Sequence, residues 1–169
     1  FLNAANGSVY LRNGDIDLSN GLTIDSDFNV FMGSPATIES GGDVAMTAAG
    51  FLTVNGNVNA DGDITLLLQG PASQDLTVGG LLASGGDINI DNAGLGDVLM
   101  SGSTSMFSTG LIDVTAGGDI VLAGFIDSAT TFNADAGLNL TFDGQVQAGT
   151  GATLNSGNDM TLNGVMIVE

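Results

Sequence analysis

The stretch LTVNGNVNA, from Leu52 to Ala60, decides the fold, because its pattern returns along the rest of the chain. Apolar residues alternate with others, a glycine stands fifth, and the pattern ends on a small residue. Clear copies begin at Leu52, Leu76, Ile120, Leu140 and Met160, and a weaker copy begins at Val98. These starts lie 20 to 24 residues apart, and degenerate copies are expected to begin at Leu2 and Leu22.

Each copy predicts two short β-strands that are joined at its glycine. Alternating apolar residues belong on one face of a strand, and we expect the glycine to turn the backbone with a positive φ. A second apolar pair, first seen at Ile64 and Leu66, follows about a dozen residues after each start and predicts a third strand. The glycines form one column: Gly56, Gly80, Gly102, Gly124, Gly144 and Gly164.

Stacking of the repeats explains how such short units acquire a core. A unit of about 20 residues cannot bury its apolar face alone, whereas stacked units share one continuous core. Three short strands per repeat describe a coil of a parallel β-solenoid, and eight starts predict about eight coils in a rod of roughly 35 to 40 Å. A β-sandwich also has short, regularly spaced strands, but it does not require a nine-residue motif in constant register.

Residues 1–169 are therefore expected to form a single all-β solenoid domain, either a segment of a longer chain or a fibre subunit. Departures from the period predict the loops. The 30-residue step from Leu22 to Leu52 leaves room for an excursion at residues 32–35. The surplus of the next step is expected at residues 70–73. Both prolines fall in these two stretches, because proline cannot donate to a ladder.

The charge of the chain narrows its possible partners. Its 169 residues carry a formal net charge of −18 and one basic side chain, Arg12. Hydrophobic residues make up 43%, which excludes a disordered acidic tail. The charge repels phosphate backbones and anionic lipids, so no nucleic-acid partner is expected. Membrane insertion is not expected either, because the longest apolar stretch, residues 64–68, is far shorter than the roughly 20 residues that span a bilayer.

No catalytic, cofactor-binding or metal-binding residue is assigned, and we expect the chain not to be an enzyme. Without His or Cys it has no His-based acid/base pair, no thiol nucleophile and no zinc site of the usual kind. Carboxylate pairs can hydrolyse glycosides. Sites of that kind, however, add basic residues and aromatic platforms for sugars, and this chain has one Arg, one Tyr and no Trp.

A mostly acidic column stands immediately before the copies of the motif: Phe51, Asp75, Asp97, Asp119, Asn139 and Asp159. Stacking places these side chains about 5 Å apart, where like charges repel unless water, salt or a cation intervenes. In one interpretation each Asp accepts a hydrogen bond from a nearby backbone N–H at a turn. In the other, oxygen-rich rows bind Ca²⁺, and loss of thermal stability in EDTA would favour it. Further calcium candidates are three pairs: Asp15/Asp17, Asp25/Asp27 and Asp61/Asp63.

The motif core LTVNGNVNA and the recurring Gly-Gly-Asp-Ile segments, at residues 85–90 and 117–122, resemble the repeats of filamentous haemagglutinin-type adhesins. The resemblance covers most of the chain from about Leu52 onward and transfers no functional residue. It implies a right-handed parallel β-helix that is exported by a two-partner route. It also implies an extracellular place on a bacterial surface and a structural or adhesive role.

The sequence thus predicts a non-catalytic, rigid and acidic solenoid module of an extracellular fibre, which stacks end to end. Its last strand is expected to be apolar on both faces, with Met166 inward and Val165 and Ile167 outward. Such a strand should contact another coil, from the same polypeptide or from the next fibre subunit. A calcium-dependent binding or matrix module is the alternative function, and a polysaccharide-acting β-helix enzyme is a remote one.

Overall fold

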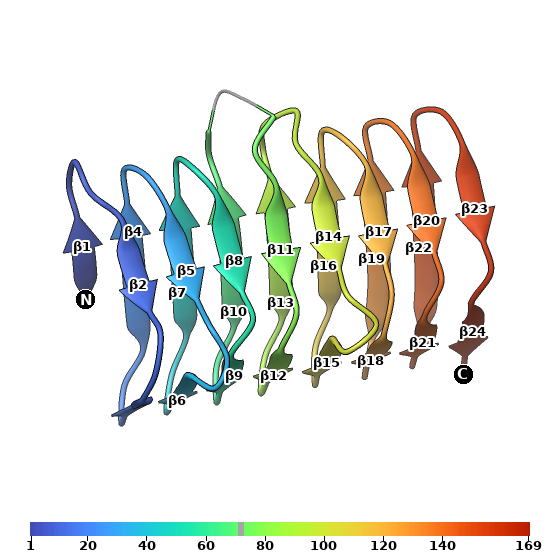
Figure 1. Ribbon diagram of the computed structural model, residues 1–169. Helices are drawn as coiled ribbons and strands as arrows, with labels where there is room; N and C mark the ends of the chain where they lie inside the picture. The colour runs from blue at the N-terminus through green and yellow to red at the C-terminus, as the bar shows by residue number, and fades with distance from the viewer. Residues whose placement is uncertain (71–72) are drawn as a thin grey trace.

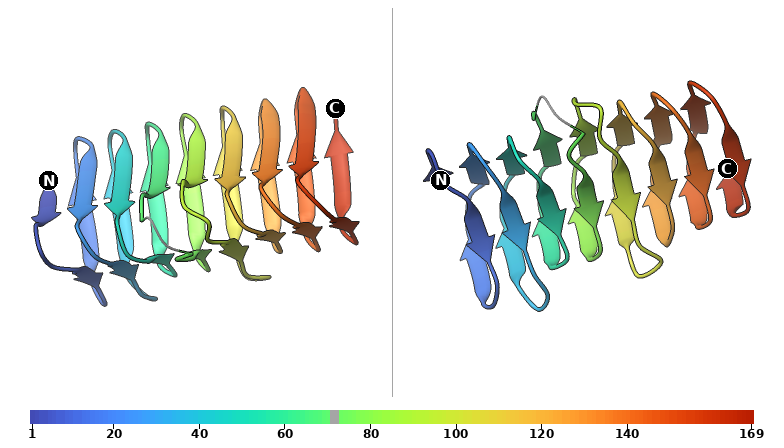
Figure 2. Two further views of the ribbon diagram at one scale, coloured as in Figure 1. Left: turned by 90° about the horizontal axis from the view of Figure 1, so that it is seen from above. Right: turned by 45° about the horizontal axis from the view of Figure 1, so that its top comes forward.

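The computed structural model describes residues 1–70 and 73–169, which form strands, turns and loops and no helix. The chain winds as a right-handed solenoid of eight coils, with the two termini at opposite ends of the rod (Figure 1, Figure 2). Each coil gives one strand to each of three parallel, eight-stranded sheets. The predicted right-handed parallel β-solenoid of about eight coils is therefore confirmed.

The three sheets each collect every third strand of the chain. Sheet I lies at the back of Figure 1 and contains β1 (Leu2–Ala4), β4 (Leu22–Ser26), β7 (Val44–Ala48), β10 (Ile64–Leu68), β13 (Ile88–Asn92), β16 (Ile112–Ala116), β19 (Thr131–Ala136) and β22 (Gly151–Ser156). Sheet II lies at the front and contains β2 (Val9–Leu11), β5 (Val30–Met32), β8 (Leu52–Val54), β11 (Leu76–Val78), β14 (Val98–Met100), β17 (Ile120–Leu122), β20 (Leu140–Phe142) and β23 (Met160–Leu162). Sheet III lies below and contains β3 (Asp15–Leu18), β6 (Thr37–Ser40), β9 (Asn57–Ala60), β12 (Leu81–Ser84), β15 (Ser105–Ser108), β18 (Phe125–Ser128), β21 (Gln145–Ala148) and β24 (Val165–Val168).

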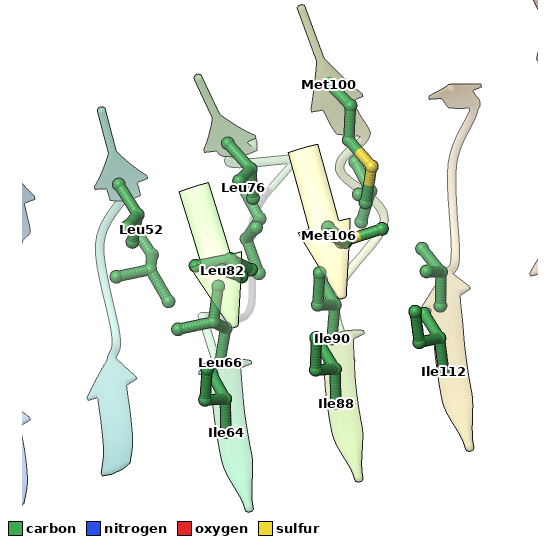
Figure 3. Packing of buried hydrophobic residues seen from close by; sticks show 14 of the residues in the cluster. Leu52, Ile64, Leu66, Leu76, Leu82, Ile88, Ile90, Met100, Met106 and Ile112 are labelled. Atoms are coloured by element: carbon green, nitrogen blue, oxygen red, sulfur yellow. The ribbon is translucent and has the colours of Figure 1, made fainter. Parts of the chain in front are cut away.

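The core fills the space between the three sheets with rows of similar apolar side chains. Ile64, Ile88 and Ile112 pair in register on neighbouring strands of sheet I and are fully buried. Figure 3 shows them beside the inward side chains of the other two sheets, such as Leu76 and Leu82. One row therefore buries the next, as the period-two pattern requires.

The N-terminal coils follow a different register from the predicted one. Leu22 pairs with Val44 in sheet I, so it does not begin a copy in the column of Leu52. β8 pairs instead with β5, which begins at Val30. β5 pairs in turn with β2, which begins at Val9. The prediction failed because LTIDSDFNV has Ser26 where the motif has glycine, and an alternating strand without the glycine fits either sheet. Leu2 likewise lies in sheet I, where it pairs with Ile24. The column of Leu52 in sheet II begins at Val9 instead.

The two predicted loops lie at the stretches that contain proline. The 30-residue step does not exist, because the copy before Leu52 begins at Val30 rather than at Leu22. Residues 33–36 connect β5 to β6, and the peptide bond before Pro35 is cis. The connection from β10 to β11, residues 69–75, is the longer of the two. Residues 71 and 72, which belong to the predicted surplus at 70–73, lie outside the described residues.

Five of the six column glycines stack as predicted. Glycine is needed there because the backbones of neighbouring coils approach closely, and not because the backbone has a positive φ. A Cβ at Gly80 would collide with the carbonyl oxygen of Gly56 in the coil below. A positive φ occurs at Gly124 (109°) and at no other column glycine, all of which the structure describes. Gly102 is the exception, because the connection from β14 to β15 has four residues and brings Thr104 into the column instead.

Replacement of Gly80 by alanine should destabilise the protein strongly, because the new Cβ has no space against the Gly56 backbone. Overpacking of this kind costs about 1 to 3 kcal/mol of unfolding free energy. The matched control is Gly102→Ala, at a glycine where an added Cβ would meet no atom within 4 Å. Urea unfolding followed by circular dichroism should show a change below about 0.5 kcal/mol for the control. Equal effects of the two substitutions would contradict the stacking of Gly80 on Gly56.

Candidate functional site

From Asp75 to Asn139 the acidic column forms a ladder, in which each side chain accepts a backbone hydrogen bond from the next coil. Asp75 Oδ1 accepts from the N–H of Asp97 (3.1 Å), and Asp97 Oδ1 accepts from the N–H of Asp119 (2.8 Å). Asp119 Oδ1 accepts from the N–H of Asn139 (2.9 Å), and Asn139 Oδ1 from the N–H of Asp159 (3.2 Å). The backbone interpretation of this column is confirmed, although the donor belongs to the neighbouring coil rather than to the same turn.

Phe51 interrupts this ladder because its side chain offers no acceptor. Its own N–H is still bound, by Oδ1 of Asn29 in the preceding coil (2.9 Å). Asn29 stands immediately before β5 and so occupies the same column. The predicted column did not include Asn29, since the copy was expected to begin at Leu22 rather than at Val30.

A second acidic ladder precedes the strands of sheet I. Asp43 Oδ1 accepts from the N–H of Asp63 (2.9 Å), and Asp63 Oδ1 accepts from the N–H of Asp87 (2.8 Å). Asp87 Oδ1 then accepts from the N–H of Leu111 (2.7 Å). The signal that could have revealed this ladder is the Gly-Asp pair before β7, β10 and β13, at residues 42–43, 62–63 and 86–87.

Buried serines satisfy the backbone at the turn that leads from sheet III to sheet I. Ser84 Oγ donates to the carbonyl oxygen of Gly62 (2.7 Å) and accepts from the N–H of Gly86 (3.0 Å). Ser108 repeats both bonds one coil later. Among the described residues, no buried side-chain nitrogen or oxygen lacks a partner. These serines therefore have a structural role that accounts for the small residue at the end of the motif.

The candidate calcium ligands form no cation site among the described residues, although Asp17 and Asp61 line one open hollow with Glu39. Asp15 and Asp17 lie on β3, with side chains along one strand on the outer face of sheet III. Asp27 accepts a hydrogen bond from the N–H of Asn6 (2.9 Å) through Oδ2, while Asp25 lies on β4. Within residues 1–70 and 73–169, no group of three or more acidic side chains is placed to hold a metal ion.

Asp61, from the third pair, lines an open hollow of about 420 Å³ on sheet III. Glu39 and Phe107 line the same hollow. Phe107 lies three strands from Glu39 along the same column of sheet III, so the ring does not stand beside that carboxyl as an aromatic platform for a sugar would. Arg12 does not line this hollow, and the carboxyl with a raised pKa, Asp91, is not among its lining residues either.

Asp91 lies on the outer face of sheet I, in β13. Burial raises the pKa of its carboxyl, and the negative charge of Asp113 on the neighbouring strand raises it further. Both groups are carboxyl groups, so the shift reflects burial and mutual repulsion, and neither side chain lines the hollow on sheet III.

Comparison with protein-family models, with curated proteins and with solved structures finds no match. The resemblance to filamentous haemagglutinin-type repeats therefore stays a prediction. The part of the chain that the structure describes has no helix of the length and apolarity needed to cross a membrane.

Replacement of Asp97 by alanine should lower the free energy of unfolding by about 1 to 2 kcal/mol, because the N–H of Asp119 loses its acceptor. Asp97→Asn is the matched variant, since an amide oxygen accepts the same bond, as Asn139 does for Asp159. Denaturant unfolding should show near-wild-type stability for the asparagine variant. A loss as large as that of alanine would instead make the negative charge essential.

Asp91→Asn should stabilise the protein at neutral pH. A carboxyl whose folded-state pKa is raised contributes stability that is complete below its ordinary value of 3.8 and is lost as the pH rises through the folded-state pKa. The amide stays neutral, so its advantage over aspartate should be present at pH 7 and vanish below 3.8. Thermal unfolding across this pH range measures the difference, and an advantage that persists in acid would contradict this cause.

Proposed function

We propose that this chain is a rigid, non-catalytic structural module of an extracellular fibre, which elongates by the addition of further solenoid coils at its ends. The fold supports the structural part of the proposal: a parallel β-solenoid is a repeat architecture whose coils contact only their neighbours. The extracellular, bacterial-surface location and the adhesive role rest on the resemblance of the repeats alone.

Rigidity of the module follows from the unbroken pairing of its sheets. Every strand interior to the rod pairs with one strand on each side, and side-chain ladders add bonds at two of the corners. A structural role also agrees with the chemistry of the described residues, in which the buried hydroxyl groups bind backbone atoms rather than a general base.

The observation that carries the proposal is the open core at the two ends. In the last coil, Leu162 and Met166 continue the core columns of Phe142 and Val146, yet they are exposed. The core columns that end at Met160 and Leu162 in the last coil begin at Val9 and Leu11 in the first coil. A coil placed head to tail would thus bury apolar residues against apolar residues and pair strand edges that are otherwise open.

Met166→Asp should prevent this contact, because it would bury an unpaired carboxylate in the junction. Ile167→Asp is the matched control: it adds the same charge to the same strand, and the two side chains are similarly exposed, at 37% for Met166 and 40% for Ile167. Ile167, however, continues the outward column of Gln147. We expect wild-type protein and Ile167→Asp to form end-to-end oligomers that grow with concentration and salt, and Met166→Asp to stay monomeric.

Analytical ultracentrifugation and negative-stain electron microscopy measure this difference. Salt should favour the oligomers because it screens repulsion between copies that each carry a net charge of −18. Equal assembly of the two variants would contradict a junction through the core, and a wild-type protein that stays monomeric at high salt would contradict self-stacking.

A further inference from the structure

The aromatic and basic side chains of the first two coils gather at one place on the outer face of sheet II. Tyr10 of β2 and Phe31 of β5 are neighbours in register, with ring centroids 6.4 Å apart and planes inclined by 45°. The guanidinium carbon of Arg12 lies 5.3 Å from the centroid of the Tyr10 ring. The chain's one arginine and its one tyrosine therefore form a single cluster with Phe31.

This cluster borders the hollow with the greatest volume among those described, about 650 Å³, which is within the usual range for small-molecule sites. Asn13, Ser34 and Asn55 also line it and add amide and hydroxyl groups. The hollow is open to solvent, and it combines aromatic side chains, a cation and neutral hydrogen-bonding groups, which are the kinds of group that orient a small ligand.

The connection between β5 and β6 holds the Phe31 ring at the wall of this hollow. The backbone of Gly33 lies so close to the ring that a Cβ there would stand 3.0 Å from Cε1 of Phe31. Tyr10 is half exposed (51%), so part of its side chain is accessible to a ligand beside Arg12, whereas the Phe31 ring is backed by the Gly33 backbone. The arrangement leaves the aromatic surface open to solvent at a defined place.

Arg12 supplies the specificity of the site. Among the described residues no carboxylate forms an ion pair with it, and its guanidinium lies over the Tyr10 ring instead. A guanidinium that stacks on an aromatic face still presents N–H groups along its edge, which match the two oxygens of a carboxylate. The net charge of −18, and Asp15 beside an adjoining smaller hollow that also contains Arg12, disfavour a polyanion.

We propose that this hollow binds a small monocarboxylate that carries a flat-faced ring. The ring stacks on Tyr10 and Phe31, the carboxylate accepts hydrogen bonds from Arg12, and remaining polar groups of the ligand meet Asn13, Ser34 and Asn55. An aromatic acid and a uronic acid sugar share this chemistry. The site lies on the outer face of sheet II in the first coils, next to the edge strand β2 that the proposed stacking would pair, and all of its lining residues belong to one copy of the chain.

Four compounds test the proposal by isothermal titration calorimetry: hydrocinnamate and galacturonate, each beside its neutral counterpart, hydrocinnamamide and galactose. We expect at least one acid to bind at millimolar concentration or below, and about tenfold or more tighter than its counterpart. Binding of hydrocinnamate alone would identify the ring as aromatic, and binding of galacturonate alone would identify it as a sugar. Since Tyr10 is the sole tyrosine of a chain without tryptophan, its fluorescence offers a direct second readout.

Variants assign the binding to these residues. Arg12→Gln should abolish the preference for the acid, and Tyr10→Ala should weaken both acid and neutral compound, whereas Tyr10→Phe should retain binding by calorimetry. Phe107→Ala is the control, because it removes a similarly exposed ring (40%) from sheet III. Circular dichroism verifies that each variant is folded, and Met166→Asp should bind as wild type.

Three results would overturn the proposal: neither acid binds at millimolar concentration, the neutral counterpart binds equally well, or Arg12→Gln leaves the preference unchanged. A failure of end-to-end assembly would leave this proposal standing, because the wild-type monomer contains the complete hollow.

Discussion

In-register stacking of one coil on the next is the constraint on which the rest of this structure depends. Parallel strands lie about 4.8 Å apart, so every position meets its own equivalent in the neighbouring coil at that spacing. Where the backbones turn this corner, a side chain on the upper residue would collide with the coil below, as a Cβ at Gly80 would with the carbonyl oxygen of Gly56. The glycine column is therefore a consequence of coil-to-coil contact rather than of an unusual backbone conformation at each turn.

The same constraint makes charge a problem that the fold must solve locally. Stacking repeats an aspartate at the same corner in successive coils, and a chain with one basic side chain cannot pair its 19 acidic ones. The backbone provides the compensation, since Asp75, Asp97 and Asp119 each accept an N–H from the next coil. Each bond links two coils and also offsets part of the repulsion, because hydrogen bonds to a carboxylate favour its charged form. Asn139 keeps the hydrogen bond without adding a charge.

The sequence predicted the fold wherever the motif was complete. From Leu52 onward the alternation, the glycine and the period agree, and the structure has the predicted strands and register. Near the N-terminus the pattern is ambiguous, because strands of all three sheets alternate in the same way and only the corner glycine tells them apart. The prediction for Gly102 was wrong for a related reason. Two extra residues before β15 place Thr104 at the corner, and the spacing counted from Val98 does not reveal them. Composition likewise could not place Arg12 beside Tyr10 and Phe31, because their proximity follows from that unpredicted register.

The irregular first coils of this molecule contain the proposed ligand site, whereas the regular coils form the rod. A perfectly regular solenoid would offer the same outer surface at every coil, and any ligand site on it would recur along the whole rod. Further along sheet II, the column of Tyr10 and Phe31 contains Thr53 and Thr77. The large rings, the arginine and the four-residue connection at residues 33–36 occur together where the motif is most degenerate. The regular coils make the rod stiff and allow it to be extended. A ligand site that occurs once requires an interruption of the repeat, and the hollow at Arg12 lies at such an interruption.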